Sequence, residues 1–69
     1  MKISGESLQK LAKGRPEVLA MTFAKMLRDF GYPSLTAEYV QKVIGDYEPG
    51  KTPAGIIEMF VFGWLEDGI

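Results

Sequence analysis

The sequence predicts an all-α protein, a compact bundle of four short helices that forms one domain over residues 1–69. Two observations predict this fold. Apolar residues recur at spacings of three and four along most of the chain, which is the helical period. Glycines and prolines divide the chain into four such segments. The expected helices span about residues 4–13, 16–30, 36–47 and 53–66.

The first two segments have well-marked ends. Ser4 is a candidate N-cap, because its hydroxyl can accept a hydrogen bond from a first-turn amide. Gly14 ends the first helix, and Pro16 suits the first turn of the second, where a missing N–H costs nothing. The second helix ends at Gly31, after an apolar stripe made of Leu19, Phe23, Met26, Leu27 and Phe30.

The third and fourth helices are predicted from similar signals. The third begins at Thr36 as N-cap, and its expected buried face consists of Tyr39, Val40, Val43, Ile44 and Tyr47. Thr52 as N-cap and Pro53 at the first helical position open the fourth. This segment is apolar at eight of the ten positions from 56 to 65. A helix that is apolar on nearly all sides needs cover from other elements or from a partner.

The composition limits how such a small domain can be stabilised. A chain of about 60 residues buries only about 60% of its unfolded surface, and without cysteine it has no disulfides. We therefore expect stability to come from good packing or from association with another chain. The N-terminal residues lead into no apolar run, and no apolar stretch approaches the roughly 20 residues of a membrane span. A cytoplasmic protein without membrane contact is expected.

The net charge of −1 conceals an asymmetry between the two halves of the chain. Residues 1–28 carry six positive and two negative groups, whereas residues 29–69 carry two positive and seven negative groups. The basic half offers possible nucleic-acid contacts at Lys10, Lys13, Arg15, Lys25 and Arg28. We favour the simpler interpretation that the two halves neutralise each other, because the chain as a whole is acidic.

Residues 16–47 support an alternative function, a nucleic-acid-associated helix-turn-helix-like protein, because a short glycine-containing turn joins two helices there. As a DNA-reading helix, the third segment would bring Glu38 and Asp46 toward phosphate with only Lys42 to compensate. The turn is also longer than the usual three to four residues. Nucleic acid is therefore kept as the alternative partner and is not the expected one.

Residues 45–52, Gly-Asp-Tyr-Glu-Pro-Gly-Lys-Thr, match in full the phosphate-binding loop pattern G-x-x-x-x-G-K-[ST]. The preceding segment reads as a helix instead of a buried strand, and the 17 residues that follow cannot supply a parallel sheet. Asp46 and Glu48 would repel a polyphosphate, and Pro49 removes one amide from the loop. From Gly45 to Thr52 we therefore predict a helix-ending loop and no nucleotide site.

Residues that could carry catalysis are scarce. The chain has no histidine to act as a general base or to activate a serine, and its acidic residues lack metal-ligand spacing. Glu58, inside the apolar fourth segment, could be a buried acid for acid–base chemistry, but we favour the solvated edge of a helix. The sequence predicts neither an enzyme nor a bound metal or cofactor.

The run Met-Leu-Arg-Asp-Phe-Gly-Tyr (26–32), followed by a helix, a loop and an apolar helix ending in Trp64-Leu65, resembles a ubiquitin-associated three-helix domain. In that family a Met-Gly-Phe/Tyr loop and the last helix form the ubiquitin-binding patch. Here Phe30-Gly31-Tyr32 replaces the loop without its methionine, and the loop before the last helix is longer. The resemblance covers about 40 residues and no function is carried over from it, since aromatics at helix ends usually pack as anchors.

The remaining expectation concerns a surface. We predict a non-catalytic protein–protein interaction module that binds another protein, or itself as a homodimer, through the apolar last helix. The candidate partner-binding residues on that helix are Met59, Phe60, Phe62 and Trp64.

Overall fold

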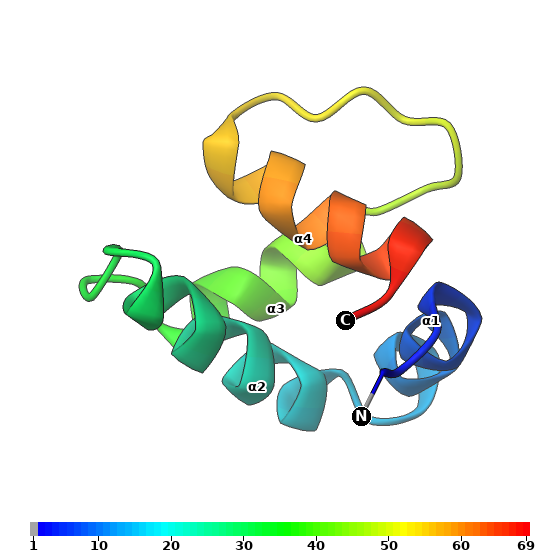
Figure 1. The fold of residues 1–69 in the computed structure, drawn as a ribbon, viewed down its shortest axis with the longest axis horizontal. Coiled ribbons are helices and arrows are strands. Elements are labelled where there is room, and N and C mark those ends of the chain that lie inside the picture. The colour runs from blue at the N-terminus through cyan, green and yellow to red at the C-terminus, as the bar shows by residue number, and fades with distance from the viewer. Residues whose placement is uncertain (1) are drawn as a thin grey trace.

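The computed structural model describes residues 2–69 and contains four α-helices: α1 (Gly5–Gly14), α2 (Pro16–Asp29), α3 (Ala37–Gly45) and α4 (Ile56–Asp67). They pack around an apolar core, so the predicted all-α bundle is confirmed (Figure 1). α2 packs most extensively on α3, while α1 contacts both α2 and α4. None of the described helices is both long and apolar enough to cross a membrane.

Two of the predicted N-caps are confirmed. Ser4 Oγ accepts a hydrogen bond from Ser7 N at 3.2 Å and so caps α1. Thr36 Oγ1 accepts from Tyr39 N at 3.1 Å and caps α3. Each bond satisfies one of the free amides in the first turn of a helix. The two helices therefore begin where their capping residues place them.

The structure corrects two details of α3. The helix ends at Gly45, earlier than residue 47, and Tyr47 packs from the loop that follows. Tyr39 does not belong to the buried face, because its side chain is 47% exposed. It lies about 100° around the helix from Val40, at the border of the packed side. The buried residues of α3 are Val40, Val43 and Ile44.

The start of α4 also differs from the prediction. The helix begins at Ile56 instead of residue 53, and its N-cap is Gly55, which makes no side-chain capping bond. Thr52 is therefore not the cap. Glu58 Oε1 accepts from Ala54 N at 2.9 Å, and its negative charge lies in the first turn, at the positive end of the helix dipole. This capping role accounts for the acidic residue inside the apolar segment.

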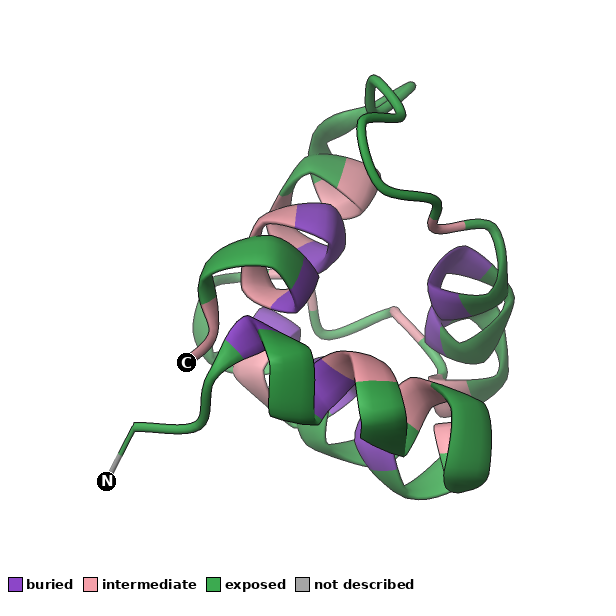
Figure 2. Ribbon diagram, turned by 90° about the vertical axis from the view of Figure 1, so that its right-hand side faces the viewer, coloured by how far each residue is buried: buried purple, intermediate pink, exposed green. Residues whose placement is uncertain are grey.

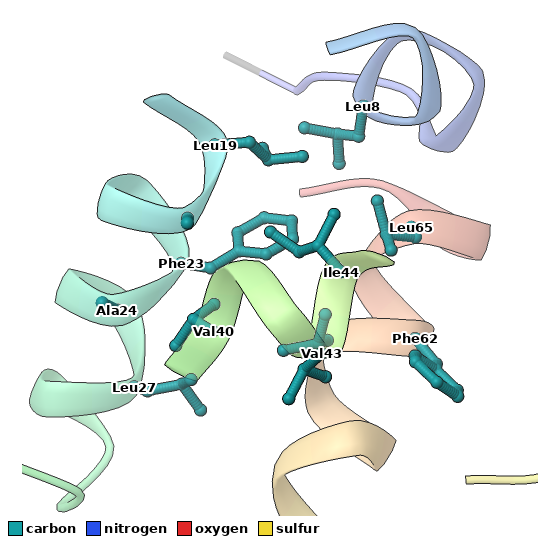
Figure 3. Packing of buried hydrophobic residues seen from close by; sticks show 12 residues of the cluster. Leu8, Leu19, Phe23, Ala24, Leu27, Val40, Val43, Ile44, Phe62 and Leu65 are labelled. Carbon is teal, nitrogen blue, oxygen red and sulfur yellow. The ribbon is translucent and has the colours of Figure 1, made fainter. Parts of the chain in front are cut away.

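The core draws side chains from all four helices. Figure 3 shows Phe23 reaching from α2 toward Ile44 of α3 near the centre of the cluster. In Figure 2 the buried positions lie on the inner sides of the helices, while the loop from α3 to α4 is exposed almost throughout. No polar or charged side chain within residues 2–69 is buried. The buried residues are Leu8, Leu19, Ala20, Phe23, Ala24, Leu27, Val40, Val43, Ile44, Val61, Phe62 and Leu65.

The two ends of the described chain meet in the fold. Ile3 N donates to Ile69 O at 2.5 Å, and Ile69 N donates to Ile3 O at 2.8 Å. Gln9 Nε2 donates to Leu65 O at 2.6 Å. Gly5 is buried so closely against α4 that a Cβ atom there would lie 2.7 Å from the Leu65 carbonyl oxygen. These contacts fasten the C-terminal end of α4 to the start of α1.

Gly68 completes this arrangement. Its φ of 91° lies in the left-handed region, which favours glycine, and a Cβ atom at this position would overlap the Ile3 carbonyl oxygen. The backbone can therefore turn back from the end of α4, so that Ile69 pairs with Ile3. We call the contacts of Ile3, Gly5, Gln9, Leu65, Gly68 and Ile69 the terminal junction.

Candidate protein-binding surface

Aromatic side chains bridge the C-terminal end of α2 and the outer side of α4. The ring centroids of Phe30 and Phe60 are 5.4 Å apart with an interplanar angle of 9°. Those of Phe30 and Trp64 are 6.2 Å apart at 22°, and those of Tyr32 and Phe60 are 6.2 Å apart at 60°. Ile56 and Met59 also lie exposed on α4. We call this set the aromatic surface; its members are Phe30, Tyr32, Ile56, Met59, Phe60 and Trp64.

The side chains of the aromatic surface are partly exposed to solvent and also contact other aromatic rings. Phe30 is 59% exposed and Met59 is 52% exposed, while Phe60 and Trp64 are half-buried. The Trp64 ring also contacts the fully buried Phe23, with centroids 4.9 Å apart. Aromatic rings at these centroid distances gain energy from packing on each other. A partner would therefore meet aromatic side chains that are already ordered, which lowers the entropy cost of binding.

The local sequence explains why Phe30 stays at the surface. α2 ends at Asp29, and Gly31, with a φ of 105°, turns the chain sharply away from the helix axis. Gly31 N donates to Arg28 O and Tyr32 N donates to Leu27 O, both at 3.0 Å. These two bonds form the Schellman motif that a glycine after the C-cap permits. Phe30 is thus held at the helix end, beside α4 and open to solvent.

The four predicted binding residues of α4 separate into two groups. Met59, Phe60 and Trp64 belong to the aromatic surface, but Phe62 is only 2% exposed and cannot contribute to it. Phe62 lies about 200° around the helix from Phe60 and packs against Tyr47, with centroids 5.2 Å apart. The helix that is apolar all round is therefore covered by its own chain on one side and half open on the other.

The sequence does not predict Phe30 and Tyr32 as binding residues; as aromatics at a helix end they are expected to be packing anchors. Tyr32 is half-buried against the core cluster, which agrees with that role in part, but Phe30 is largely exposed. The available signal was a Phe-Gly-Tyr run at a helix end, which fixes the turn. What the run does not reveal is that α4 passes beside it, because that contact joins residues 30 apart in the sequence or more.

Three of the five candidate nucleic-acid residues line two different hollows of the surface. Lys10, Lys13, Arg15, Lys25 and Arg28 are all exposed. Lys13 borders a cavity beside Ile44 and Tyr47, whereas Lys25 and Arg28 line the groove between α2 and α3, next to Leu35. A strong phosphate-binding surface needs several cations that can reach one backbone together. Lys13 is thus separated from Lys25 and Arg28, which line a different groove.

The cavity beside α1 and the end of α3 has a volume of about 300 Å³, and Gln9, Tyr47 and Pro49 also line it. The pKa of the Tyr47 phenol lies above its ordinary value, first because the group is partly buried and then because the Glu66 carboxylate is close and accepts its hydrogen bond. Both causes favour the neutral phenol. Within residues 2–69 there is no group of three or more side chains suited to hold a metal ion.

The segment that matches the phosphate-loop pattern has a different geometry. Gly45 is the last residue of α3, so the pattern follows a helix and not a strand. Lys51 Nζ donates to the Asp46 carbonyl oxygen at 3.1 Å. Thr52 lies in the exposed loop before α4, which begins only at Ile56. Backbone amides of a helix N-terminus are therefore not placed directly after the lysine, as phosphate binding in that motif requires.

Comparison with known proteins gives no match to the chain among family models, curated proteins or solved structures. The similarity to ubiquitin-associated domains stays a hypothesis, and the proposals below do not depend on it.

Proposed function

We propose that the protein is a non-catalytic interaction module that binds another protein through the aromatic surface. The observation that carries the proposal is the 59% exposure of Phe30, a large apolar ring that stacks on two half-buried neighbours. Contiguous exposed apolar patches of this kind mark interaction sites. Aromatic side chains and methionine are also enriched where partners bury their central contacts.

The geometry favours binding over a purely structural role for these rings. A structural anchor gains most when its surface is removed from water, and Phe62 achieves this on the same helix at 2% exposure. Phe30 and Met59 leave more than half of their surface in water. A partner that covers these two side chains would remove their exposed apolar surface from water, which favours binding.

The test compares the wild type with Phe30→Ser and with Val18→Ser. Val18 is the matched control, because it is an apolar residue of α2 that is 47% exposed and lies outside the aromatic surface. Proteins captured from the source cells are quantified for each variant, and the candidate partner is then purified and titrated. Trp64 is the only tryptophan of the chain, so its fluorescence reports binding at this surface.

Phe30→Ser is expected to weaken partner binding roughly tenfold or more, which is the effect of losing one central aromatic contact. Val18→Ser is expected to leave the affinity unchanged, and the purified partner should shift the Trp64 emission. Equal capture by all three proteins, or a purified partner that leaves Trp64 unaffected, would overturn the proposal.

Self-association is the homodimeric form of the same proposal, and sedimentation equilibrium tests it directly. A dimer of the wild type that Phe30→Ser dissociates would make a second copy the partner. If the measured mass stays that of a monomer at high concentration, the homodimer is excluded.

The alternative function, nucleic-acid binding, is supported by the exposure of all five basic side chains. The separation of Lys13 from Lys25 and Arg28, which line a different groove, argues against it. So do the exposed Glu38 and Asp46 of the α3 region. A gel-shift experiment with mixed oligonucleotides at low salt distinguishes the two functions. A salt-dependent shift that is lost in Lys10→Gln/Lys13→Gln would favour nucleic acid, because phosphate contacts release counterions.

A further inference from the structure

We infer that a groove between α2 and α3 is a second binding surface, which takes an acidic peptide segment whose carboxylates lie beside apolar side chains. This groove shares no residue with the aromatic surface, so the inference does not rest on the proposed function. We call it the α2–α3 groove; its lining includes Met21, Ala24, Lys25, Arg28, Leu35 and Ala37.

The α2–α3 groove has a volume of about 430 Å³. Four residues of α2 line it, at positions 21, 24, 25 and 28, and spacings of three and four place them on one face of that helix. Its other side is the segment from Leu35 to Ala37, which leads into α3. At a rise of 1.5 Å per residue the part of α2 that lines the groove is about 10 Å long. A short peptide segment matches that length.

The apolar part of the groove includes one side chain that the fold leaves uncovered. Met21 is 64% exposed, more than Phe30 at 59%, although it lies in the middle of α2. Ala24 is buried, while Leu35 and Ala37 are half-buried against the core. A partner's apolar side chain that covers Met21 removes apolar surface from water. The flexible thioether of methionine can also adapt to the shape of that side chain.

The charged part of the groove is positive. Lys25 and Arg28 are exposed and three residues apart on α2, so their side chains are neighbours. Among residues 2–69 no carboxylate lines the groove; Asp29 and Glu38 only follow lining residues in the sequence. A carboxylate from a partner therefore supplies the complementary charge, and an arginine can bind it through two parallel hydrogen bonds.

A nucleic-acid strand fits the α2–α3 groove less well than a peptide. Its two cations can neutralise few phosphates, and the other basic residues of the N-terminal half do not line it. A phosphate backbone would also leave Met21 and Leu35 without an apolar partner. An acidic peptide with apolar side chains uses both parts of the groove at once.

The experiment uses three short fluorescein-labelled peptides with the same leucine positions, whose polar positions are all glutamate, all glutamine or all lysine. Each is titrated with the full chain at low salt, and fluorescence anisotropy measures the affinity. The glutamate peptide is expected to bind roughly fivefold more tightly than the glutamine peptide, as two exposed ion pairs suggest. The lysine peptide should bind most weakly, and the preference for glutamate should decline as salt is added.

Two double variants identify the source of the preference. Lys25→Gln/Arg28→Gln should reduce the preference for glutamate over glutamine to roughly twofold or less, because both ion pairs are lost. Lys10→Gln/Arg15→Gln is the matched control, since it removes one lysine and one arginine from exposed positions outside the groove. It should leave the preference intact.

The apolar part of the groove is tested separately. Met21→Ser should weaken the glutamate and glutamine peptides by the same factor, roughly threefold, because both cover the same apolar surface. Val18→Ser is the control, an apolar residue of α2 that is 47% exposed and does not line the groove. Amide NMR of the full chain should show the largest shifts on peptide binding at Lys25 and Leu35.

Failure of every peptide to bind, equal affinities for the glutamate and glutamine peptides, or a preference that both double variants reduce equally would overturn the inference. Amide shifts concentrated at Phe30 and Phe60 would overturn it too, while supporting the proposed function. Mixed oligonucleotides that displace the glutamate peptide and shift the same groove amides would make nucleic acid the occupant. A dimer that Lys25→Gln/Arg28→Gln dissociates would make a second copy the occupant, and either result would overturn the inference.

Discussion

Two regions hold α4 in place, and they do so in opposite ways. At the terminal junction, backbone meets backbone: Ile3 pairs with Ile69, and Gly5 leaves no room for a Cβ atom. At the aromatic surface, side chains from α2 and α4 bridge the two helices and remain open to solvent. One end of α4 is thus held by backbone packing that leaves no room for larger side chains. Its outer side carries aromatic rings that folding leaves partly exposed to solvent.

The comparison teaches that burial and stacking are separate properties. Phe60 and Phe62 are the same residue type two positions apart, and both contact other rings. Only Phe62 is removed from water. Substitutions at the core and the terminal junction should therefore affect stability, and those at the aromatic surface should affect binding.

The largest expected effect distinguishes these two phenylalanines. Phe62→Ala should lower the free energy of unfolding by about 3–5 kcal/mol, because it leaves a cavity in the core. Phe60→Ala should cost about half as much or less, since its ring is only half-buried. Urea unfolding followed by circular dichroism measures both values. Equal losses would show that the aromatic surface is part of the core.

A second prediction tests the close approach at Gly5. Gly5→Ala should lower the free energy of unfolding by about 1–3 kcal/mol, because the added methyl group must displace the backbone of α4. Gly14→Ala is the matched control at the other end of α1, where a Cβ atom meets nothing within 4 Å. It should be neutral or stabilising by up to about 1 kcal/mol. Thermal unfolding of the two variants provides the comparison.

A third prediction concerns the backbone turn at Gly68. Gly68→Ala should destabilise the protein by about 1–2 kcal/mol, since alanine disfavours a positive φ and its methyl group would overlap Ile3. Hydrogen exchange of the Ile3 and Ile69 amides should accelerate more than that of Val40 in the core. Gly63→Ala, in open space on α4, should instead stabilise the helix by up to about 1 kcal/mol. Unchanged exchange at Ile3 would contradict a pairing of the chain ends.

The smallest expected effect is a pH dependence at Tyr47. Its pKa is raised above the ordinary 10.0, so the folded state holds the phenolic proton more tightly than the unfolded state does. The corresponding stability is fully present below about pH 10 and is lost as the pH rises through the folded-state pKa. Tyr47→Phe should therefore show a shallower loss of stability between about pH 9 and 11 than the wild type. Parallel slopes for the two proteins would contradict the raised pKa of Tyr47, which burial and the Glu66 carboxylate cause.

Local signals predicted much of the fold. Ser4 and Thr36 cap their helices as expected, and Gly31 ends α2 through bonds that depend only on neighbouring residues. The prediction that α4 begins at residue 53 was wrong, because the Thr-Pro signal competes with a carboxylate further along the chain. Glu58 accepts a hydrogen bond from Ala54 N, and the helix begins at Ile56. Several residues can supply the same capping bond, so propensity alone does not select one.

The candidate surface could be predicted only in part. The sequence identified α4 as too apolar to be covered on every side, and it included Met59, Phe60 and Trp64. It could not decide which side is covered, because a helix that is apolar all round carries no amphipathic pattern. The error at Phe62 follows from this missing pattern. Phe30 was omitted for another reason, because its contact with α4 joins residues far apart in the chain.

By itself, the sequence determined the fold class and most helix boundaries, since glycine, proline and the capping residues act on the backbone within one turn. Only the tertiary structure decided that the two chain ends pair and that Phe30 meets Phe60 and Trp64 across the bundle. Those contacts join residues far apart in the chain. They depend on how four helices share one small core, and no local period records that arrangement.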